Sequence, residues 1–311
     1  MATNVTNEAE TNVIKKAQIA KVRELDFATL FGENVQNLIK MLGITRKIPV
    51  TAGTALKVLK VTGTLQSGAV PEGEIIPLSQ YQTTWTAVAE ATLNKWRKAT
   101  TAEAIIKGGY DQAVNETNKK MLLDIQKSIR TQFIGFLAAE DASKTPATGV
   151  GLQAALANAW GKAQILFEDD AVQMVYFINP LDIADYLGKA NITVQTAFGL
   201  NYIENFLGLG TVIMSGTITQ GSFYATAAEN IVAYYINVNE ENGLGEAFSF
   251  TTDPETGMIG IHEVGNYDRL QEETVAVSGI TLFAERVDGI IQGTITAPEA
   301  DTADEGEGGE G

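Results

Sequence analysis

The chain has 311 residues, 45% of them hydrophobic, so it is long enough to bury a substantial core. It has no cysteine and a single histidine, His262, which excludes disulfides, thiolate chemistry and the usual zinc or copper sites. The net charge of −16 argues against a dedicated nucleic-acid binder, because such proteins present a dominant basic face.

The charge is divided unevenly along the chain. Residues 1–130 hold 17 Lys and Arg against 12 Asp and Glu, whereas residues 131–311 hold 5 against 26. A basic part and a strongly acidic part on one chain favour head-to-tail contact between copies, because complementary potentials orient association. The alternative interpretation is chance segregation together with a solvated acidic tail.

Residues 1–45 are expected to form an N-terminal arm and one short helix. Residues 1–23 are polar, with no clear periodicity and no apolar region of a signal peptide, which indicates an extended or mobile arm. Apolar residues then recur at helical spacing up to a stop at Gly43, namely Leu25, Leu30, Phe31, Val35, Leu38, Ile39 and Leu42. No apolar stretch approaches the ~20 residues that span a bilayer, so a soluble protein made in a cytoplasm is expected.

Residues 46–93 are predicted to form a long, extended β-hairpin loop. Residues 47–66 are rich in Val, Thr and Leu, and apolar residues alternate with more polar ones up to residue 93. Between these runs, SGAVPEGEIIP carries the glycines and prolines of a loop tip. Arms of 15–20 residues would reach on the order of 50–60 Å. Because a lone hairpin is marginal in water, something is expected to bind it.

The rest of the chain is predicted to form two domains and a tail. Residues 94–150 and 255–297 are assigned to a peripheral domain whose longest helix covers 110–139, after a break at Gly108 and Gly109. Alternating helices and strands over 151–254 indicate a compact α/β domain. The acidic, glycine-rich segment 298–311 is expected to be disordered. The predicted fold class is α+β.

One glycine pattern resembles a nucleotide site. Gly149, Val150 and Gly151, followed by Ala154, resemble the start of a dinucleotide fingerprint, with acids at 168–170 near the expected distance. The motif needs a preceding strand, and EDASKTPAT is not predicted to be one, so we interpret the pattern as a loop that enters a helix. The acidic run 168–170 has ligands for a hard cation but is interpreted as a solvated turn.

Other candidate site residues also have structural interpretations. Asp182 and Asp185 lie one turn apart near the start of a predicted helix, where they favour the helix dipole. His262 lies in an apolar strand and is interpreted as a satisfied structural histidine, and Phe206 and Trp160 as core residues. We therefore predict no catalytic residue, no cofactor site and no metal site.

The order of these parts resembles the Hong Kong 97-type fold of tailed-bacteriophage major capsid proteins. Within residues 68–79, the EGEIIP sequence looks like the "EGxxIP" tip of that family's extended loop. The stretch NKWRKATTAEAI, which begins at Asn94, is similar to the junction between that loop and the family's long spine helix. The resemblance in architecture covers nearly the whole chain.

The resemblance implies a structural protein of the virion, with no cofactor. Copies would form hexamers and pentamers of an icosahedral shell around phage DNA, assembled in the host cytoplasm. The α/β domain would be axial and the spine helix peripheral. The intersubunit loop tip would comprise Gly68, Val70, Pro71, Glu72, Gly73, Glu74 and Pro77.

The expected partners follow from the same resemblance. Only some 45 residues precede the hairpin, too few for a fused scaffolding region, so a separate scaffolding protein is predicted alongside a portal. Contact with packaged double-stranded DNA would be weak and non-specific, and no membrane is involved. The alternatives are an encapsulin-like nanocompartment shell of the same fold, an α/β enzyme with an unrecognised site, and a ligand-binding surface protein.

Overall fold

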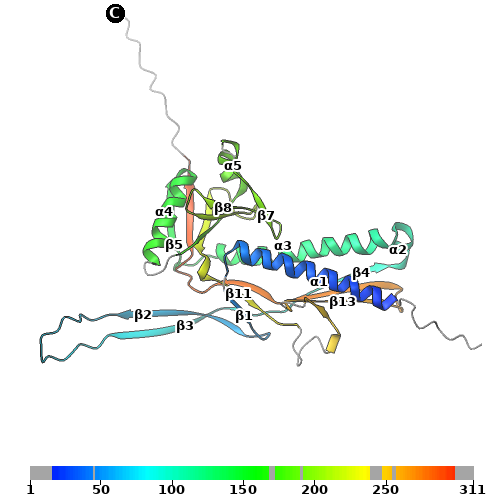
Figure 1. Ribbon diagram of the computed structural model, residues 1–311, viewed down its shortest axis with the longest axis horizontal. Helices are drawn as coiled ribbons and strands as arrows, with labels where there is room; N and C mark the ends of the chain where they lie inside the picture. The colour runs from blue at the N-terminus through cyan, green and yellow to red at the C-terminus, as the bar shows by residue number, and fades with distance from the viewer. Residues whose placement is uncertain are drawn as a thin grey trace, which may run out of the picture. The chain divides into compact units, whose positions relative to one another are not determined.

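The computed structural model describes residues 16–44, 46–167, 172–189, 192–238, 247–253 and 257–297, which form a mixed helical and sheet fold (Figure 1). The expected arm over 1–15 and the tail over 298–311 lie outside these residues. Two compact units are present: unit 1 holds 1–40, 44–133 and 232–283, and unit 2 holds 41–43, 134–231 and 284–311.

Unit 1 contains three separate sheets. Their strand orders are β12-β13-β14-β4, β1-β11-β15 and β2-β3. The strands are β1 (Arg46–Pro49), β2 (Ala55–Thr64), β3 (Gln80–Glu90), β4 (Asn94–Thr101), β11 (Ile231–Tyr235), β12 (Thr251–Thr252), β13 (Ile259–Asn266), β14 (Gln271–Ser278) and β15 (Ile280–Ala284). The helices are α1 (Lys16–Met41), α2 (Ala102–Gly108), the π-helical turn η1 (Asp111–Asn115) and α3 (Glu116–Ala138), whose last residues belong to unit 2.

Helix α1 is longer than the sequence indicated. It begins at Lys16, whereas a short helix from Leu25 and an extended segment before it were expected. At the end of this extension, the buried Glu24 carboxylate accepts hydrogen bonds from the Thr251 hydroxyl at 2.6 Å and from the backbone N–H of Glu263. A polar residue next to the first residue of the expected helix thus makes a long-range contact that the apolar pattern did not indicate.

The boundary between the units differs from the predicted one. The α/β region was expected to end at residue 254, whereas the central segment of unit 2 ends at Ile231 and the chain continues in unit 1. The reason is the pairing of β11, which lies parallel to β1 with Arg46 opposite Val232 and Pro49 opposite Tyr235. Strand β11 is therefore part of unit 1, although its apolar sequence would also suit the interior of an α/β domain.

The long helix of unit 1 starts as the glycines predicted. α2 ends at Gly108, and Gly109 follows with φ 77°, a conformation that favours glycine. The turn η1 then leads into α3, so the first turn of the expected 110–139 helix is π-helical. Along α3 a buried stripe recurs every three or four residues, with Leu122, Ile125, Ile129 and Phe133.

Unit 2 is built on one seven-stranded mixed sheet. The strand order is β5-β16-β10-β6-β9-β8-β7. The strands are β5 (Thr145–Val150), β6 (Met174–Ile178), β7 (Gln195–Ala197), β8 (Leu200–Phe206), β9 (Gly210–Met214), β10 (Ser222–Ala227) and β16 (Ile291–Thr296). The helices are α4 (Gly151–Leu166), α5 (Pro180–Lys189) and the 3₁₀ turn η2 (Ala228–Asn230).

The core of unit 2 lies between its sheet and α4. All five residues of the central strand β6 are buried, as expected for a strand covered on both faces. Helix α4 places one face against the sheet, and its buried residues are Leu152, Ala155, Leu156, Ala159 and Ala163. The small alanines allow close approach of the helix to the sheet, but each buries less apolar surface than a larger side chain would.

One edge of this sheet is closed by side chains. Strand β5 pairs in parallel with β16 on its inner side. Two other β5 carbonyls, of Pro146 and Thr148, accept hydrogen bonds from Lys162 Nζ and from Asn158 Nδ2, the latter at 2.8 Å. Both donors come from α4.

Within the described residues, no helix is long and apolar enough to cross a membrane.

Candidate assembly surface

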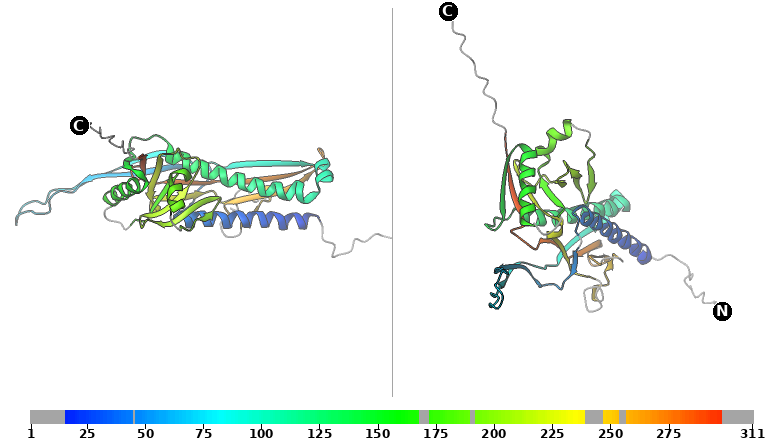
Figure 2. Two further views of the ribbon diagram at one scale, coloured as in Figure 1. Left: turned by 90° about the horizontal axis from the view of Figure 1, so that it is seen from above. Right: turned by 60° about the vertical axis from the view of Figure 1, so that its left-hand side comes forward.

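The paired strands β2 and β3 form a two-stranded sheet that joins no other strand of the described chain (Figures 1 and 2). The antiparallel register runs from Ala55 opposite Glu90 to Thr64 opposite Gln80. Ten residues of strand correspond to about 33 Å at ~3.3 Å per residue, less than the 50–60 Å expected. The shortfall arises because residues 46–49 form β1, and a turn at 50–54 separates them from β2.

The base of the hairpin is anchored by backbone bonds and buried side chains. The N–H of Gly53 donates to the carbonyl of Ala91, and the N–H of Ala91 donates to the carbonyl of Thr54, both at 2.9 Å. Leu56 and Ala91 are buried beside this closure. The attachment is therefore firm, although the hairpin has no further strand beside it in the described chain.

The tip of the hairpin is a structured loop over 65–79. The N–H of Glu74 donates to the carbonyl of Pro71 at 3.2 Å, and Gly73 has φ 88°, which the third position of this kind of turn requires. The N–H of Gln66 donates to the Ser79 hydroxyl at 3.0 Å and holds the loop ends together.

The seven residues predicted for the tip all lie in this loop. Gly68, Pro71, Glu72, Gly73, Glu74 and Pro77 are exposed, and Val70 is half-buried.

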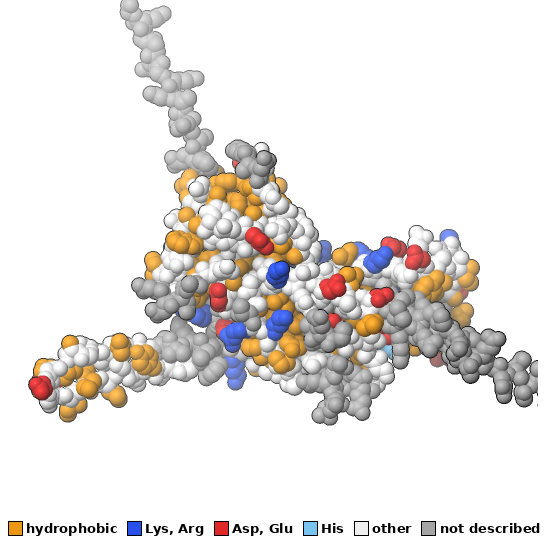
Figure 3. Space-filling view, viewed as in Figure 1, with side chains coloured by type: hydrophobic (Ala, Val, Ile, Leu, Met, Phe, Trp, Pro, Cys, Tyr) orange, Lys and Arg blue, Asp and Glu red, His pale blue; other side chains and the backbone are white. Residues whose placement is uncertain are grey.

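Apolar side chains recur along the exposed end of the hairpin, with acidic side chains at its extremity (Figure 3). Leu65 is 77% exposed, Ile75 94%, Ile76 75%, Leu78 92% and Tyr81 61%. We call these five residues the tip patch. Scattered exposed apolar residues are common, whereas a concentration of exposed apolar residues is typical of interaction surfaces. The predicted tip set omitted the tip patch, although the IIPL run that carries three of its members was the available signal.

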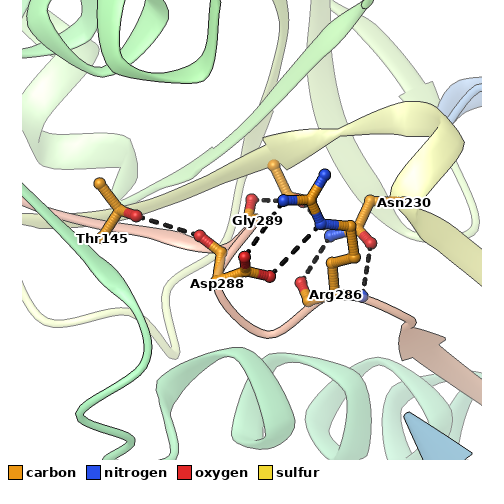
Figure 4. A network of polar contacts seen from close by, with 6 residues as sticks. Thr145, Asn230, Arg286, Asp288 and Gly289 are labelled. Atoms are coloured by element: carbon orange, nitrogen blue, oxygen red, sulfur yellow. Dashed lines mark hydrogen bonds and ion pairs between the residues drawn. The ribbon is translucent and has the colours of Figure 1, made fainter. Parts of the chain in front are cut away.

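Figure 4 shows a polar network in unit 2 that fixes the turn before β16. Asn230 Nδ2 donates to the Arg286 carbonyl at 2.9 Å, and the Arg286 N–H donates to Asn230 Oδ1 at 2.8 Å. The Arg286 guanidinium pairs with Asp288 at 3.1 Å and lies 4.9 Å from the Phe167 ring centroid. Thr145 Oγ1 donates to the Asp288 carbonyl at 3.0 Å. Thr145, Asn230 and Phe167 thus each contact the turn that holds Arg286 and Asp288, which indicates a structural role.

The structure corrects one premise about the glycine pattern. The residues before Gly151 do form a strand, β5, which includes Gly149. A Cβ on Gly149 would lie 2.3 Å from the backbone nitrogen of Ala155, so glycine is needed for close packing of strand and helix. A cleft of about 500 Å³ beside Gly151 is lined by Asp182 and Asp185, whose charge opposes phosphate binding. The acids at 168–170 lie outside the described residues.

The remaining candidates have mixed outcomes. Both carboxylate oxygens of Asp182 accept the Gly221 N–H, at 3.1 and 3.0 Å, so this side chain fixes a turn. Phe206 is a core residue, as expected, whereas Trp160 is 40% exposed and the core interpretation was wrong. His262 was expected to be satisfied, but its buried Nδ1 makes no hydrogen bond and lies 3.7 Å from a Glu24 oxygen.

The buried carboxylate of Glu273 in unit 1 is paired with a cation. Within the described ranges, no three His, Asp or Glu side chains are placed to hold a metal ion. Arg97 donates to Glu273 from Nε at 3.0 Å and from Nη2 at 2.6 Å. These bonds, with further ones from Gln271 and Asn266, lower the pKa of Glu273 to about 2.

Comparison with solved structures identifies the fold. The structure of Gordonia phage Cozz is similar over 84% of this chain and 87% of that chain, with a TM-score of 0.52 and 10% identity. The chain has the Hong Kong 97-type fold, as its sequence resemblance implied.

Two further solved structures align with the chain. A virus-like particle from Pyrococcus furiosus aligns over 86% of this chain and 97% of its own, with a TM-score of 0.48 and 11% identity. The holo-SrpI encapsulin complex from Synechococcus elongatus PCC 7942 aligns over 83% and 87%, with a TM-score of 0.47 and 9% identity. No protein-family model matches the sequence, and the search of curated proteins found no match.

Proposed function

We propose that the chain is the major capsid protein of a tailed bacteriophage, a structural subunit that assembles into hexamers and pentamers of an icosahedral head shell. The observation that carries the proposal is the tip patch at the end of a hairpin with no other strand beside it in the described chain. Five exposed apolar side chains are unfavourable in water and favour burial against another surface. The Hong Kong 97-type fold supports the same conclusion, since the similar Cozz structure comes from a phage.

The occupant of this surface is proposed to be a neighbouring copy. The loop that includes Gly68, Val70 and Pro77 would then be intersubunit contact, and heterologous contacts of this kind close into rings. Unit 2 would correspond to the axial region and α3 to the peripheral spine helix. The chain would act without catalysis of an external substrate.

The proposed DNA contact is weak for an electrostatic reason. The basic residues of α3 are partly neutralised within the helix, because Lys119 pairs with Glu116 at 3.0 Å and Lys120 pairs with Asp124 at 2.7 Å. The net charge of the chain is −16. A shell lined by such subunits would hold DNA loosely. Subunits would assemble in the host cytoplasm with a separate scaffolding protein and a portal, and remain in the virion.

Electron microscopy of the purified recombinant protein tests the proposal. The full chain is expected to form rings, tubes or shells, and deletion of 70–75 is expected to preserve the circular dichroism spectrum and abolish the particles. A monodisperse monomer whose stability depends on a small ligand would refute the proposal in favour of an enzyme or binding protein. The nanocompartment alternative would be identified if particles purified from cells enclosed an enzyme and no nucleic acid.

A further inference from the structure

An amine, an amide and a carboxylate lie in contact inside unit 1. Lys98 Nζ of β4 is 2.5 Å from Asn118 Oδ1 of α3, and Asn118 Nδ2 donates to Glu263 Oε1 of β13 at 2.6 Å. Asn118 and Glu263 are each 8% exposed. The Asn118 side-chain amide is therefore held between a lysine amine and a buried carboxylate.

The sheet register brings these groups together. Glu263 pairs with Thr274 of β14, and Thr274 pairs with Lys98 of β4, so the three residues form one row across adjacent strands. Asn118 lies over this row from the first turn of α3. Thr274 Oγ1 donates to Asn118 Oδ1 at 3.3 Å, so two donors polarise the same carbonyl. Polarisation of this kind makes the carbonyl carbon more electrophilic.

The Lys98 amine is held close to that carbon. Its Nζ also donates to Thr117 Oγ1 at 2.6 Å and to the Val114 carbonyl at 3.2 Å, which fixes its position. Since a C=O bond is about 1.23 Å long, the Asn118 Cγ lies no more than about 3.7 Å from Nζ. This separation is close to the 3–3.5 Å of a near-attack arrangement.

The surroundings also favour the reactive form of the amine. Burial lowers the pKa of Lys98, although the charges of Glu263 and Glu272 act in the opposite direction. A lysine that loses its proton more readily is a better nucleophile. Glu263 is in hydrogen-bond contact with the amide nitrogen that would leave.

We propose that Lys98 and Asn118 form an intramolecular isopeptide bond, with Glu263 as the proton carrier. Glu263 accepts a proton from the Lys98 ammonium, and the neutral Nζ attacks Asn118 Cγ to form a tetrahedral intermediate. Collapse breaks the Cγ–Nδ2 bond, and Glu263 returns the proton to the departing nitrogen. Nζ gives up its second proton to ammonia, so one ammonium ion leaves for each amide formed.

This reaction needs no oxidant, metal or cofactor, and each chain performs it once on itself. It is independent of the proposed shell function, because all the groups belong to unit 1 of one chain. The product would join edge strand β4 to α3 by a covalent bond.

The mass of the full-length chain tests the proposal directly. After purification and incubation at mildly alkaline pH, the denatured protein is expected to be lighter by about 17 Da, the mass of ammonia, than its sequence requires. Protease digestion is expected to release one branched peptide that contains Lys98 and Asn118. An unreacted chain under these conditions overturns the proposal without the need for any variant.

Variants separate the bond from other losses of ammonia. Lys98→Met and Asn118→Ala are expected to keep the full mass, and Asn118→Asp to lose about 18 Da because water leaves in place of ammonia. Glu263→Gln is expected to slow the reaction. Lys120→Met, which changes an exposed lysine of α3, should leave the mass loss intact. Loss of ammonia in Lys98→Met would mean that Asn118 cyclises on its own backbone, and would refute the lysine bond.

Discussion

Replacement of Ile75, Ile76 and Leu78 by serine is expected to block assembly without unfolding the subunit. The three side chains are 94%, 75% and 92% exposed in the isolated chain, so they contribute almost nothing to the subunit's own core. Their removal should leave the melting temperature within about 2 °C of the unmodified value, the range typical of surface changes.

The effect on assembly follows from the area that a neighbour would cover. Complete burial of an Ile or Leu side chain contributes about 1.5–3 kcal/mol, so three would contribute about 5–9 kcal/mol at most. Burial at an interface is incomplete and carries ordering costs, so we expect about half of this. A loss of about 3 kcal/mol per contact weakens each contact by more than 100-fold, since 1.4 kcal/mol corresponds to tenfold.

Light scattering and negative-stain electron microscopy over a protein concentration series would measure this loss. A matched control is the double variant Gln80→Ser and Gln82→Ser, which alters exposed polar side chains of the same hairpin and removes no apolar surface. The control should assemble at the concentration of the unmodified protein. If the triple serine variant also did so, the tip patch would not be an assembly contact.

Three further changes have clear expected outcomes. Tyr176→Phe should stabilise the protein by about 1 kcal/mol in urea denaturation, because the buried Tyr176 hydroxyl makes no hydrogen bond. A loss of stability would show that this hydroxyl has a hydrogen-bond partner in the folded protein. Glu273→Gln should lower the melting temperature near neutral pH. This difference should disappear as the pH falls from about 5 to about 2, because Glu273 has its pKa depressed to about 2 in the fold from about 4.3 in the unfolded chain. Truncation after Ala297 should leave melting temperature and assembly unchanged, since the removed residues include six acids and no large apolar side chain; reduced stability would show that the tail docks.

Elements with a strong local pattern could be predicted from the sequence. The apolar run of β6, the periodic face of α4 and the proline at the start of α5 each determine an element without distant partners. The hairpin was also predictable, because two Thr- and Val-rich strands flank a loop with Gly and Pro. Its length was overestimated because the turn signals at the end of β1 and before β2, Pro49 and Gly53, were included in the strand.

Elements that depend on distant partners were missed or misinterpreted. The stretch that forms β4 was interpreted only as a junction, from its resemblance to the family's loop-to-helix segment, yet β4 pairs along its whole length with β14, more than 150 residues away. Strand β5 contains Pro146 and looked like a loop, but an edge strand tolerates proline. The contact between Asn118 and Glu263 joins residues 145 positions apart on α3 and β13, so no local sequence pattern reveals it.

The closed edge of the unit 2 sheet has a consequence for proteins at high local concentration. An exposed strand edge is a template on which another chain can add a strand, and repeated addition leads to fibres. At β5, Lys162 and Asn158 already occupy two backbone acceptors, and Pro146 offers no backbone donor. Strand addition at β5 is therefore hindered when many copies are close together. This removes one route to open-ended fibres, which would compete with the formation of closed particles.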